Sequence, residues 1–166
     1  MSDDMEAAVR TFFTSPRFAV AGASSEPAKF GHKIFVWYLQ HSLPATPLNP
    51  RASSITALGS EHSTVSTPSA LSSVAPPSEF SLSVITPPKI TLPLLKEAKE
   101  AGIPAVWLQP GTFDDEVLDY ARKEFKAAIA GDDQKKSLRG SVGEGWCVLV
   151  DGDWGMSLAE RKGEKL

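Results

Sequence analysis

The sequence predicts an α/β protein whose central, mainly parallel sheet is covered by helices on both faces. Short apolar runs typical of buried strands recur along the chain, and stretches with apolar side chains at helical spacing separate them. Glycine or proline stands at the end of most of these runs. Strands that are buried on both faces and alternate with helices are typical of parallel sheets.

Composition limits the domain organisation and the partners. The 166 residues, 42% hydrophobic and 22% charged, are typical of one globular domain, here expected to span 1–166. A net charge of −3, from 17 Lys and Arg against 20 Asp and Glu, argues against a general nucleic-acid binder. The single cysteine excludes an internal disulfide and a cysteine-rich metal site. The three histidines show no metal-ligand spacing.

The sequence also gives an expectation about location. No apolar run approaches the roughly 18 residues that a membrane-spanning helix requires. The segment formed by the first six residues is acidic, whereas signal and transit peptides are basic or lack acids. We therefore expect a cytoplasmic protein without a membrane or nucleic-acid partner.

The first third of the chain predicts a βαβ unit. Residues 1–15 are predicted to form an N-terminal helix that packs on the domain, and residues 17–22 an apolar strand that ends at a glycine. A helix over 30–41 and a proline-marked strand over 45–48 follow. Two strands joined by a helix within about thirty residues suit a parallel pair with a right-handed crossover. The residues expected to share the apolar face of the second helix are Phe30, Ile34, Trp37 and Tyr38.

Residues 52–83 are rich in serine and can be interpreted in two ways. Serine supplies 11 of these 32 residues and prolines recur, which is typical of a flexible linker. Apolar residues nevertheless persist through the segment. We favour an ordered, loop-rich stretch that holds a strand fragment and a helical turn.

The last half of the chain continues the alternation. Strands are predicted over 82–85 and 103–108, with a helix between them that Thr91 caps, Pro93 starts and Gly102 ends. Thr112 and Asp115 resemble a capping box for the next helix. The apolar stripe of that helix comprises Val117, Leu118, Ala121 and Phe125.

The C-terminal part is predicted to hold a loop, a last strand and a tail. Residues 131–145 are polar and rich in glycine, 146–150 form an apolar strand, and 159–166 form a charged tail expected to fray. Cys147 lies inside that strand, so we favour a buried inert cysteine over a reactive thiol. Asp114 and Asp115 are interpreted as charges that the helix dipole stabilises.

The first strand end predicts an anion site. Ligands of open α/β sheets bind beyond the carboxyl ends of the strands. Gly22 allows a sharp turn there, and the helix that follows directs free N–H groups at a bound anion, most often a pyrophosphate. Ser24 and Ser25 add hydroxyl donors, and Lys29 adds a charge. The dinucleotide pattern G-x-G-x-x-G is absent.

The second strand end narrows the choice of nucleotide. An NAD site needs a carboxylate there for the ribose, but this chain has Asn49, Pro50 and Arg51. A guanidinium at this place suits a phosphate on the ribose. Both NADP and coenzyme A carry such a phosphate, so the residues themselves leave these two ligands open.

The ordered set of motifs resembles the CoA-binding domain family, which includes the N-terminal domain of the succinyl-CoA ligase alpha subunit and small stand-alone proteins. The resemblance covers about residues 13–151 and rests on six segments. These are residues 18–24 (FAVAGAS), 29–31 (KFG), 47–50 (PLNP), 84–88 (VITPP) with 105–111 (AVWLQPG), and 146–148 (WCV).

The resemblance implies a Rossmann-like three-layer fold that binds coenzyme A or an acyl-CoA at the strand ends. The pyrophosphate is expected at the first loop, the 3′-phosphate near Arg51, and adenosine and pantetheine near the third strand end. The residues carried over as cofactor-binding are Gly22, Ala23, Ser24, Ser25, Lys29, Phe30, Gly31, Asn49, Pro50, Arg51, Thr86, Pro87, Pro88, Gln109 and Gly111.

Three functions remain open from the sequence. The leading hypothesis is a CoA-binding protein without catalysis of its own, since no nucleophile, base and acid can be assembled from the motifs. An NADP-dependent oxidoreductase or NADP sensor would share the fold and use Arg51. The third is a protein-interaction module with a vestigial nucleotide site. The oligomeric state stays open, a homodimer included.

Overall fold

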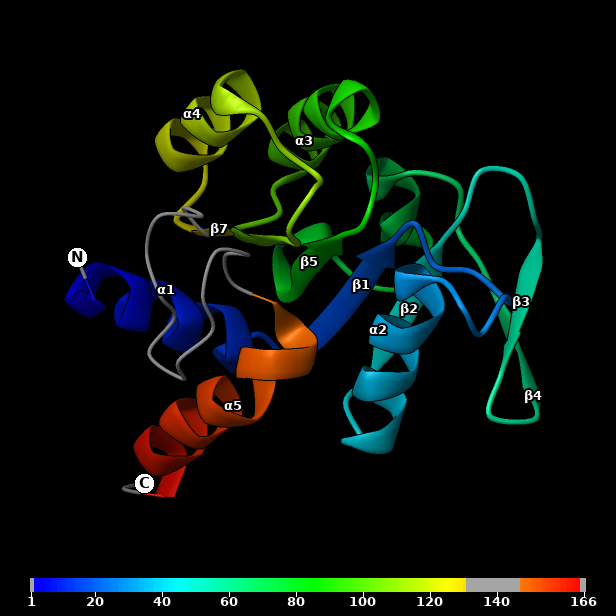
Figure 1. Ribbon diagram of the computed structural model, residues 1–166, viewed down its shortest axis with the longest axis horizontal. Helices are drawn as coiled ribbons and strands as arrows, with labels where there is room; N and C mark the ends of the chain where they lie inside the picture. Colours follow the sequence, from blue (N-terminus) through cyan, green and yellow to red (C-terminus); the bar gives the residue numbers. More distant parts are fainter. Residues whose placement is uncertain (1, 131–146, 165–166) are drawn as a thin grey trace.

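The computed structural model describes residues 2–130 and 147–164, and its centre is a sheet of five parallel strands (Figure 1). The strand order β2-β1-β5-β6-β7 confirms the predicted α/β class. The strands are β1 (Arg17–Ala21), β2 (Ala45–Leu48), β5 (Phe80–Val84), β6 (Ala105–Leu108) and β7 (Ala127–Ala130).

Helices form a layer on each side of the sheet, with α3 and α4 on one side and α1, α2 and α5 on the other (Figure 1). The helices are α1 (Ser2–Thr14), α2 (Phe30–Gln40), α3 (Pro88–Ala101), α4 (Asp115–Glu124) and α5 (Val148–Glu164). The expected three-layer arrangement is therefore present.

The alternation of side chains along each strand builds two cores. Phe18 and Val20 of β1 join the core beneath α1, α2 and α5, whereas Ala19 and Ala21 join the core beneath α3 and α4. Trp107 is fully buried in the first core, and its ring meets that of Phe12 edge-to-face at 5.5 Å. This contact between a ring of β6 and a ring of α1 attaches the helix to the sheet.

One buried polar contact ties α2 to the middle of the sheet. The hydroxyl of Tyr38 lies 2.6 Å from Oγ of Ser83 on β5, and both residues are fully buried. Burial raises the pKa of Tyr38 far above its usual value, so the phenol stays neutral. The hydrogen bond between the two hydroxyl groups gives each of them a partner inside the core.

The serine-rich segment is ordered, as predicted. It forms a hairpin of β3 (Ser54–Ala57) and β4 (Ser60–Ser63), followed by the short 3-10 helices η1 (Pro68–Ser73) and η2 (Pro77–Glu79). Positive φ angles at Leu58 (52°) and Gly59 (76°) suit the two-residue turn of such a hairpin. Val65 then bonds the outer edge of β2, donating to the carbonyl of Pro47 and accepting from the N–H of Asn49.

The C-terminal part differs from the prediction. Residues 148–150, predicted as a strand, begin α5, and this helix continues to Glu164 through most of the tail expected to fray. A short apolar run fits a buried strand and a buried helix turn equally well, so the pattern alone could not distinguish them. The fifth strand of the sheet is instead β7, an alanine-rich segment that was not predicted as a strand. Residue 146 and the loop predicted over 131–145 lie outside the described residues.

Two capping predictions and one burial prediction were also wrong. The N-cap of α3 is Pro87, and Thr91 lies inside the first turn, where its hydroxyl bonds backbone carbonyls. Asp114, not Thr112, caps α4 by accepting from the N–H of Val117. Phe30 is 60% exposed, since it stands at the first position of α2, above the buried turns of the helix.

Two contacts attach α5 to α2. A Cβ added to Gly152 would overlap the ring of Trp37, so only glycine allows this approach. Nε2 of His41 lies 2.6 Å from Oδ1 of Asp153, and the His41 ring stacks on Trp37.

We expect Gly152→Ala to lower the free energy of unfolding by about 1–3 kcal/mol through overpacking. This loss exceeds the roughly 1 kcal/mol that alanine gains over glycine in helix propensity. Chemical denaturation followed by tryptophan fluorescence measures it. In a Trp37→Phe background, which removes the overlapping ring atoms, the same substitution should cost much less. A stabilised Gly152→Ala protein would contradict the packing described here.

Candidate functional site

The strand order places a topological switch point between β1 and β5. The connection after β1 leads outward to β2, and the one after β5 leads the other way to β6, so the two loops diverge from adjacent strand ends. Ligands of open α/β sheets bind at this position. Two of the predicted segments, residues 22–25 and 86–88, follow these two strands directly.

Gly22 and Gly31 fix the geometry of the first loop. Gly22 has φ 96°, and a Cβ there would lie 2.7 Å from the carbonyl oxygen of Ile85 at the end of β5. A Cβ on Gly31 would overlap the carbonyl oxygen of Gly22. The first turn of α2 therefore lies directly against the end of β1, which no other residue at position 31 would allow.

Asn49 connects the ends of β1 and β2. Its Nδ2 donates to the carbonyl of Ala23 at 3.0 Å, and its Oδ1 accepts from the N–H groups of Arg51 at 2.8 Å and Ala52 at 3.1 Å. The side chain was predicted as a cofactor contact. In the structure it holds two loops in register with each other.

The serines of the first loop have internal partners but keep donor capacity. Oγ of Ser24 accepts from the N–H of Glu26, and Oγ of Ser25 accepts from the N–H of Thr56 on β3. In both bonds the serine oxygen is the acceptor, so each hydroxyl hydrogen is left to donate. The second bond also ties the loop to the hairpin.

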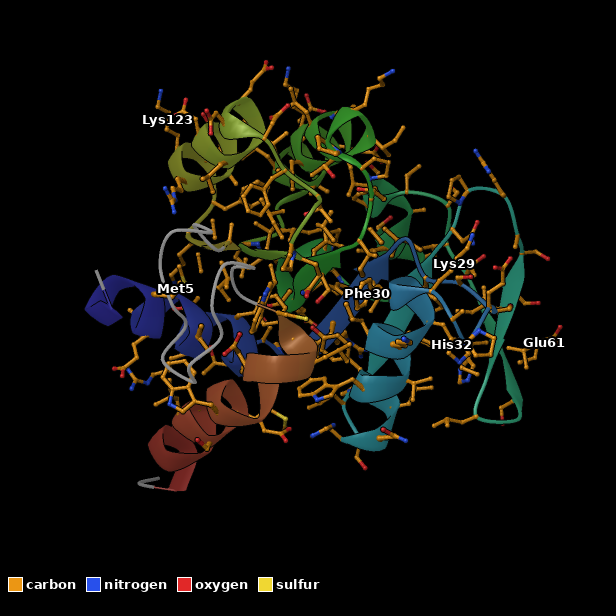
Figure 2. All side chains as sticks on the ribbon, in the orientation of Figure 1. Met5, Lys29, Phe30, His32, Glu61 and Lys123 are labelled. Carbon is orange, nitrogen blue, oxygen red and sulfur yellow. The ribbon has the colours of Figure 1, made fainter. Side chains whose placement is uncertain are left out.

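Lys29 and His32 lie at the start of α2 (Figure 2), and Arg51 follows β2. Lys29 is the N-cap residue of α2, is exposed, and forms an ion pair with Glu26 at 3.7 Å. Nδ1 of His32 donates to the carbonyl of Ser24 at 2.9 Å, which holds the ring beside the loop. Arg51 is exposed and forms no ion pair with any residue in the described ranges.

The helices that flank the switch point differ from α4 at their N-termini. No side chain caps α2 or α3, and neither has an acidic residue in its first turn. By contrast, α4 is capped by Asp114 and has two acidic residues in its first turn. Unsatisfied N–H groups and the helix dipole favour an anion at a helix start, so α2 and α3 remain available for one.

The loop after β5 is held by hydroxyl groups. Thr86 and Thr91 lie with their Oγ1 atoms 2.7 Å apart, and Thr91 also donates to the carbonyl of Thr86. These bonds hold the segment of Pro87 and Pro88 at the start of α3. Sequence reasoning missed this role of Thr91. Its position five residues after Thr86 at a helix start was the available signal.

Gln109, the residue after β6, has an unusual environment. Its side chain is 3% exposed, and its Oε1 accepts from the N–H of Val148 at the start of α5. Its Nε2 is buried and finds no acceptor among the described residues. A buried unsatisfied donor costs about 1–3 kcal/mol. Gly111, the other residue predicted here, is exposed with φ 90°.

Cys147 is not the buried strand cysteine that was predicted. It is partly exposed and directly precedes α5. Its N–H donates to Oδ2 of Asp151, a fully buried residue whose N–H bonds the Cys147 carbonyl in return. This reciprocal pair closes the first turn of α5, and no local pattern indicated it.

A shallow groove of about 480 Å³ lies away from these strand ends, along the outer edge of β2 and β4. None of the predicted cofactor-binding residues lines it. Within the described ranges, no group of three His, Cys, Asp or Glu side chains could hold a metal ion. No helix described here has the length and apolar character needed to cross a membrane.

The comparison with protein-family models decides the family. The model for a CoA binding domain matches residues 16–133, from β1 to beyond β7. The chain belongs to this CoA-binding domain family. Membership supports coenzyme A as a ligand in general, in agreement with the motifs. Curated proteins gave no match.

Solved structures show the same fold. A conserved hypothetical protein from Pyrococcus furiosus is 27% identical, with a TM-score of 0.57, and the match covers 68% of this chain and 90% of that one. A hypothetical protein from Pyrococcus horikoshii is 21% identical with a TM-score of 0.60, covering 75% and 82%. A Thermus thermophilus protein is 20% identical with a TM-score of 0.60, covering 75% and 89%.

We expect Gly31→Ala to destabilise the protein by about 3 kcal/mol, at the upper end for overpacking, because its Cβ would overlap the backbone. Gly102→Ala is the matched control. Gly102 ends α3 with φ 99° and open space around it, so only about 1 kcal/mol of backbone strain is expected. Urea denaturation measures both. Equal losses would show that the Gly22–Gly31 approach has no energetic consequence.

Proposed function

We propose that the chain binds coenzyme A or an acyl-CoA at the carboxyl edge of the sheet, through the loops after β1, β2, β5 and β6. The pyrophosphate would lie at the start of α2, among the backbone N–H groups of residues 23–25 and 30–31. Ser24, Ser25 and Lys29 would donate to it. The remaining predicted residues would surround the adenosine and the pantetheine arm.

The observation that carries this proposal is the contrast among helix N-termini. The starts of α2 and α3 lie on either side of the switch point without a capping side chain or an acid, whereas α4 has both. A helix N-terminus without an acidic side chain of its own favours the binding of an anionic group of a ligand. A diphosphate at α2 supplies this charge.

Arg51 supports coenzyme A through its position. It follows β2, its backbone is fixed by Asn49, and its guanidinium forms no ion pair with a described residue. A guanidinium binds a phosphate through two parallel hydrogen bonds. We assign it to the 3′-phosphate.

Exposed apolar side chains flank the same edge. Phe30 at the start of α2 is 60% exposed and Ile90 in the first turn of α3 is 51% exposed. Large apolar side chains on either side of an anion site suit a ligand with a purine and an alkyl arm. We propose that they contact these parts of coenzyme A.

We propose binding or sensing without catalysis, in the cytoplasm. His32 supports the absence of catalysis, since its Nδ1 donates a hydrogen bond to the backbone carbonyl of Ser24 and the ring thereby positions the loop. The proposal includes an acyl-CoA as the ligand and a homodimer as the oligomeric state. An NADP-binding protein is the alternative, because Arg51 would suit a 2′-phosphate equally well.

Isothermal titration under reducing conditions tests the ligand. Coenzyme A should bind with a dissociation constant in the micromolar range, about −8 kcal/mol, and NADPH should not bind. Arg51→Ala should weaken coenzyme A about tenfold and leave 3′-dephospho-CoA almost unchanged, since only the former carries the phosphate.

Arg122→Ala is the control, because Arg122 is an exposed arginine of α4. It should change neither affinity. Equal weakening of both ligands by Arg51→Ala would refute the assigned contact. Binding of NADPH without coenzyme A would overturn the proposed ligand.

A further inference from the structure

The ring of His41 is held between α2 and α5 by contacts at both of its nitrogen atoms. Nδ1 lies 2.7 Å from the carbonyl oxygen of Trp37, and Nε2 lies 2.6 Å from Oδ1 of Asp153. A backbone carbonyl and an ionised carboxylate can only accept hydrogen bonds. Both nitrogen atoms therefore donate in this arrangement, and only the doubly protonated, positively charged ring has two N–H groups. A ring with one proton would direct a lone pair at one of the two oxygens.

Two further features of this position favour a positive charge on the ring. The ring of His41 stacks on that of Trp37, with the centroids 4.0 Å apart and the planes 27° apart. The face of an indole attracts a cation. His41 is also the C-cap residue of α2, where the negative end of the helix dipole favours a cation.

The charged groups near the ring come down to one carboxylate. Asp153 faces it from α5, whereas the charged residues of α2, which are Lys33 and His32 when protonated, stand at the opposite end of that helix. Residues 42–44, which follow His41, carry no charge. In the described ranges, no second ion pair involves His41 or Asp153. The side chains are 28% and 78% exposed, so the ring can exchange its proton with solvent.

This pair lies where α5 meets α2. Gly152, the neighbour of Asp153, packs on the other side chain of the contact, Trp37. That packing depends on shape alone and does not respond to pH. The contact between His41 and Asp153 adds a part that depends on charge.

We propose that His41 and Asp153 form a pH-sensitive attachment of α5 to α2, which is complete while the ring holds two protons and weaker once it has lost one. Imidazole side chains change their charge between about pH 5 and 8. Because the attached form favours the protonated ring, its stabilising effect is present at the acidic end of this range and is lost as the pH rises. The inference is independent of the ligand assigned above.

Urea denaturation of four proteins at pH 5.5 and 8.5 tests the attachment. The proteins are the wild type, Asp153→Asn, His41→Phe, which retains a ring to stack on Trp37 but no donor, and the double variant. Asp153→Asn should raise the equilibrium constant for unfolding about threefold at pH 5.5 and leave it nearly unchanged at pH 8.5. In the His41→Phe background, Asp153→Asn should have no effect at either pH.

Asp119→Asn is the matched control, because Asp119 forms an exposed ion pair with Lys123, whose charge is the same at both pH values. Its effect on unfolding should not depend on pH. Hydrogen exchange, corrected for the intrinsic effect of pH, should show that α5 loses protection between pH 5.5 and 8.5 in the wild type but not in His41→Phe, while β1 is unchanged in both. An effect of Asp153→Asn that is equal at both pH values, or that persists in the His41→Phe background, would overturn the proposal.

Discussion

The contact between Gly31 and the carbonyl of Gly22 determines the arrangement of the candidate site. Because neither residue has a side chain, the first turn of α2 lies directly on the end of β1. That position directs the uncapped N-terminus of α2 at the switch point and places Tyr38, two turns later, where it reaches Ser83 on β5. The Asn49 carboxamide and the Ser25 hydroxyl then attach the next two segments to the same loop.

The candidate site is held together mainly by contacts between loops, and the groups proposed to bind its ligand are mostly backbone N–H groups and exposed charged side chains. Asn49, Thr91 and His32 each use polar atoms on neighbouring backbone, so they position the edge of the sheet. Four side chains keep N–H or O–H groups that could donate a hydrogen bond to a phosphate, namely those of Ser24, Ser25, Lys29 and Arg51. Gln109 holds the start of α5 through the oxygen of its carboxamide, and its buried NH₂ group finds no acceptor in the described part of the chain.

Local pattern was sufficient for the first βαβ unit and for the glycine turn that follows β1. Gly22, the helix over 30–40 and the strand over 45–48 are fixed by neighbouring residues, and the structure has them where periodicity predicts. The prediction of the last strand was wrong because the apolar side chains of residues 148–150 fit a buried strand and a buried helix turn equally well. Gly152 suits this helix because Trp37 packs against it, and that contact cannot be inferred from the neighbouring residues. β7 was missed because alanine indicates a strand weakly. The partners of Asn49, Thr91 and Gln109 depend on tertiary contacts, which no local pattern contains.

The edge of the sheet at β2 has a consequence for how copies of the protein behave at high concentration. An exposed parallel strand offers a row of N–H and C=O groups with which another sheet can pair. At this edge Val65 already bonds the carbonyl of Pro47 and the N–H of Asn49, and Pro47 has no N–H to offer. The strand that anchors Arg51 is therefore protected against edge-to-edge aggregation by the proline in its centre and by the segment that follows the hairpin.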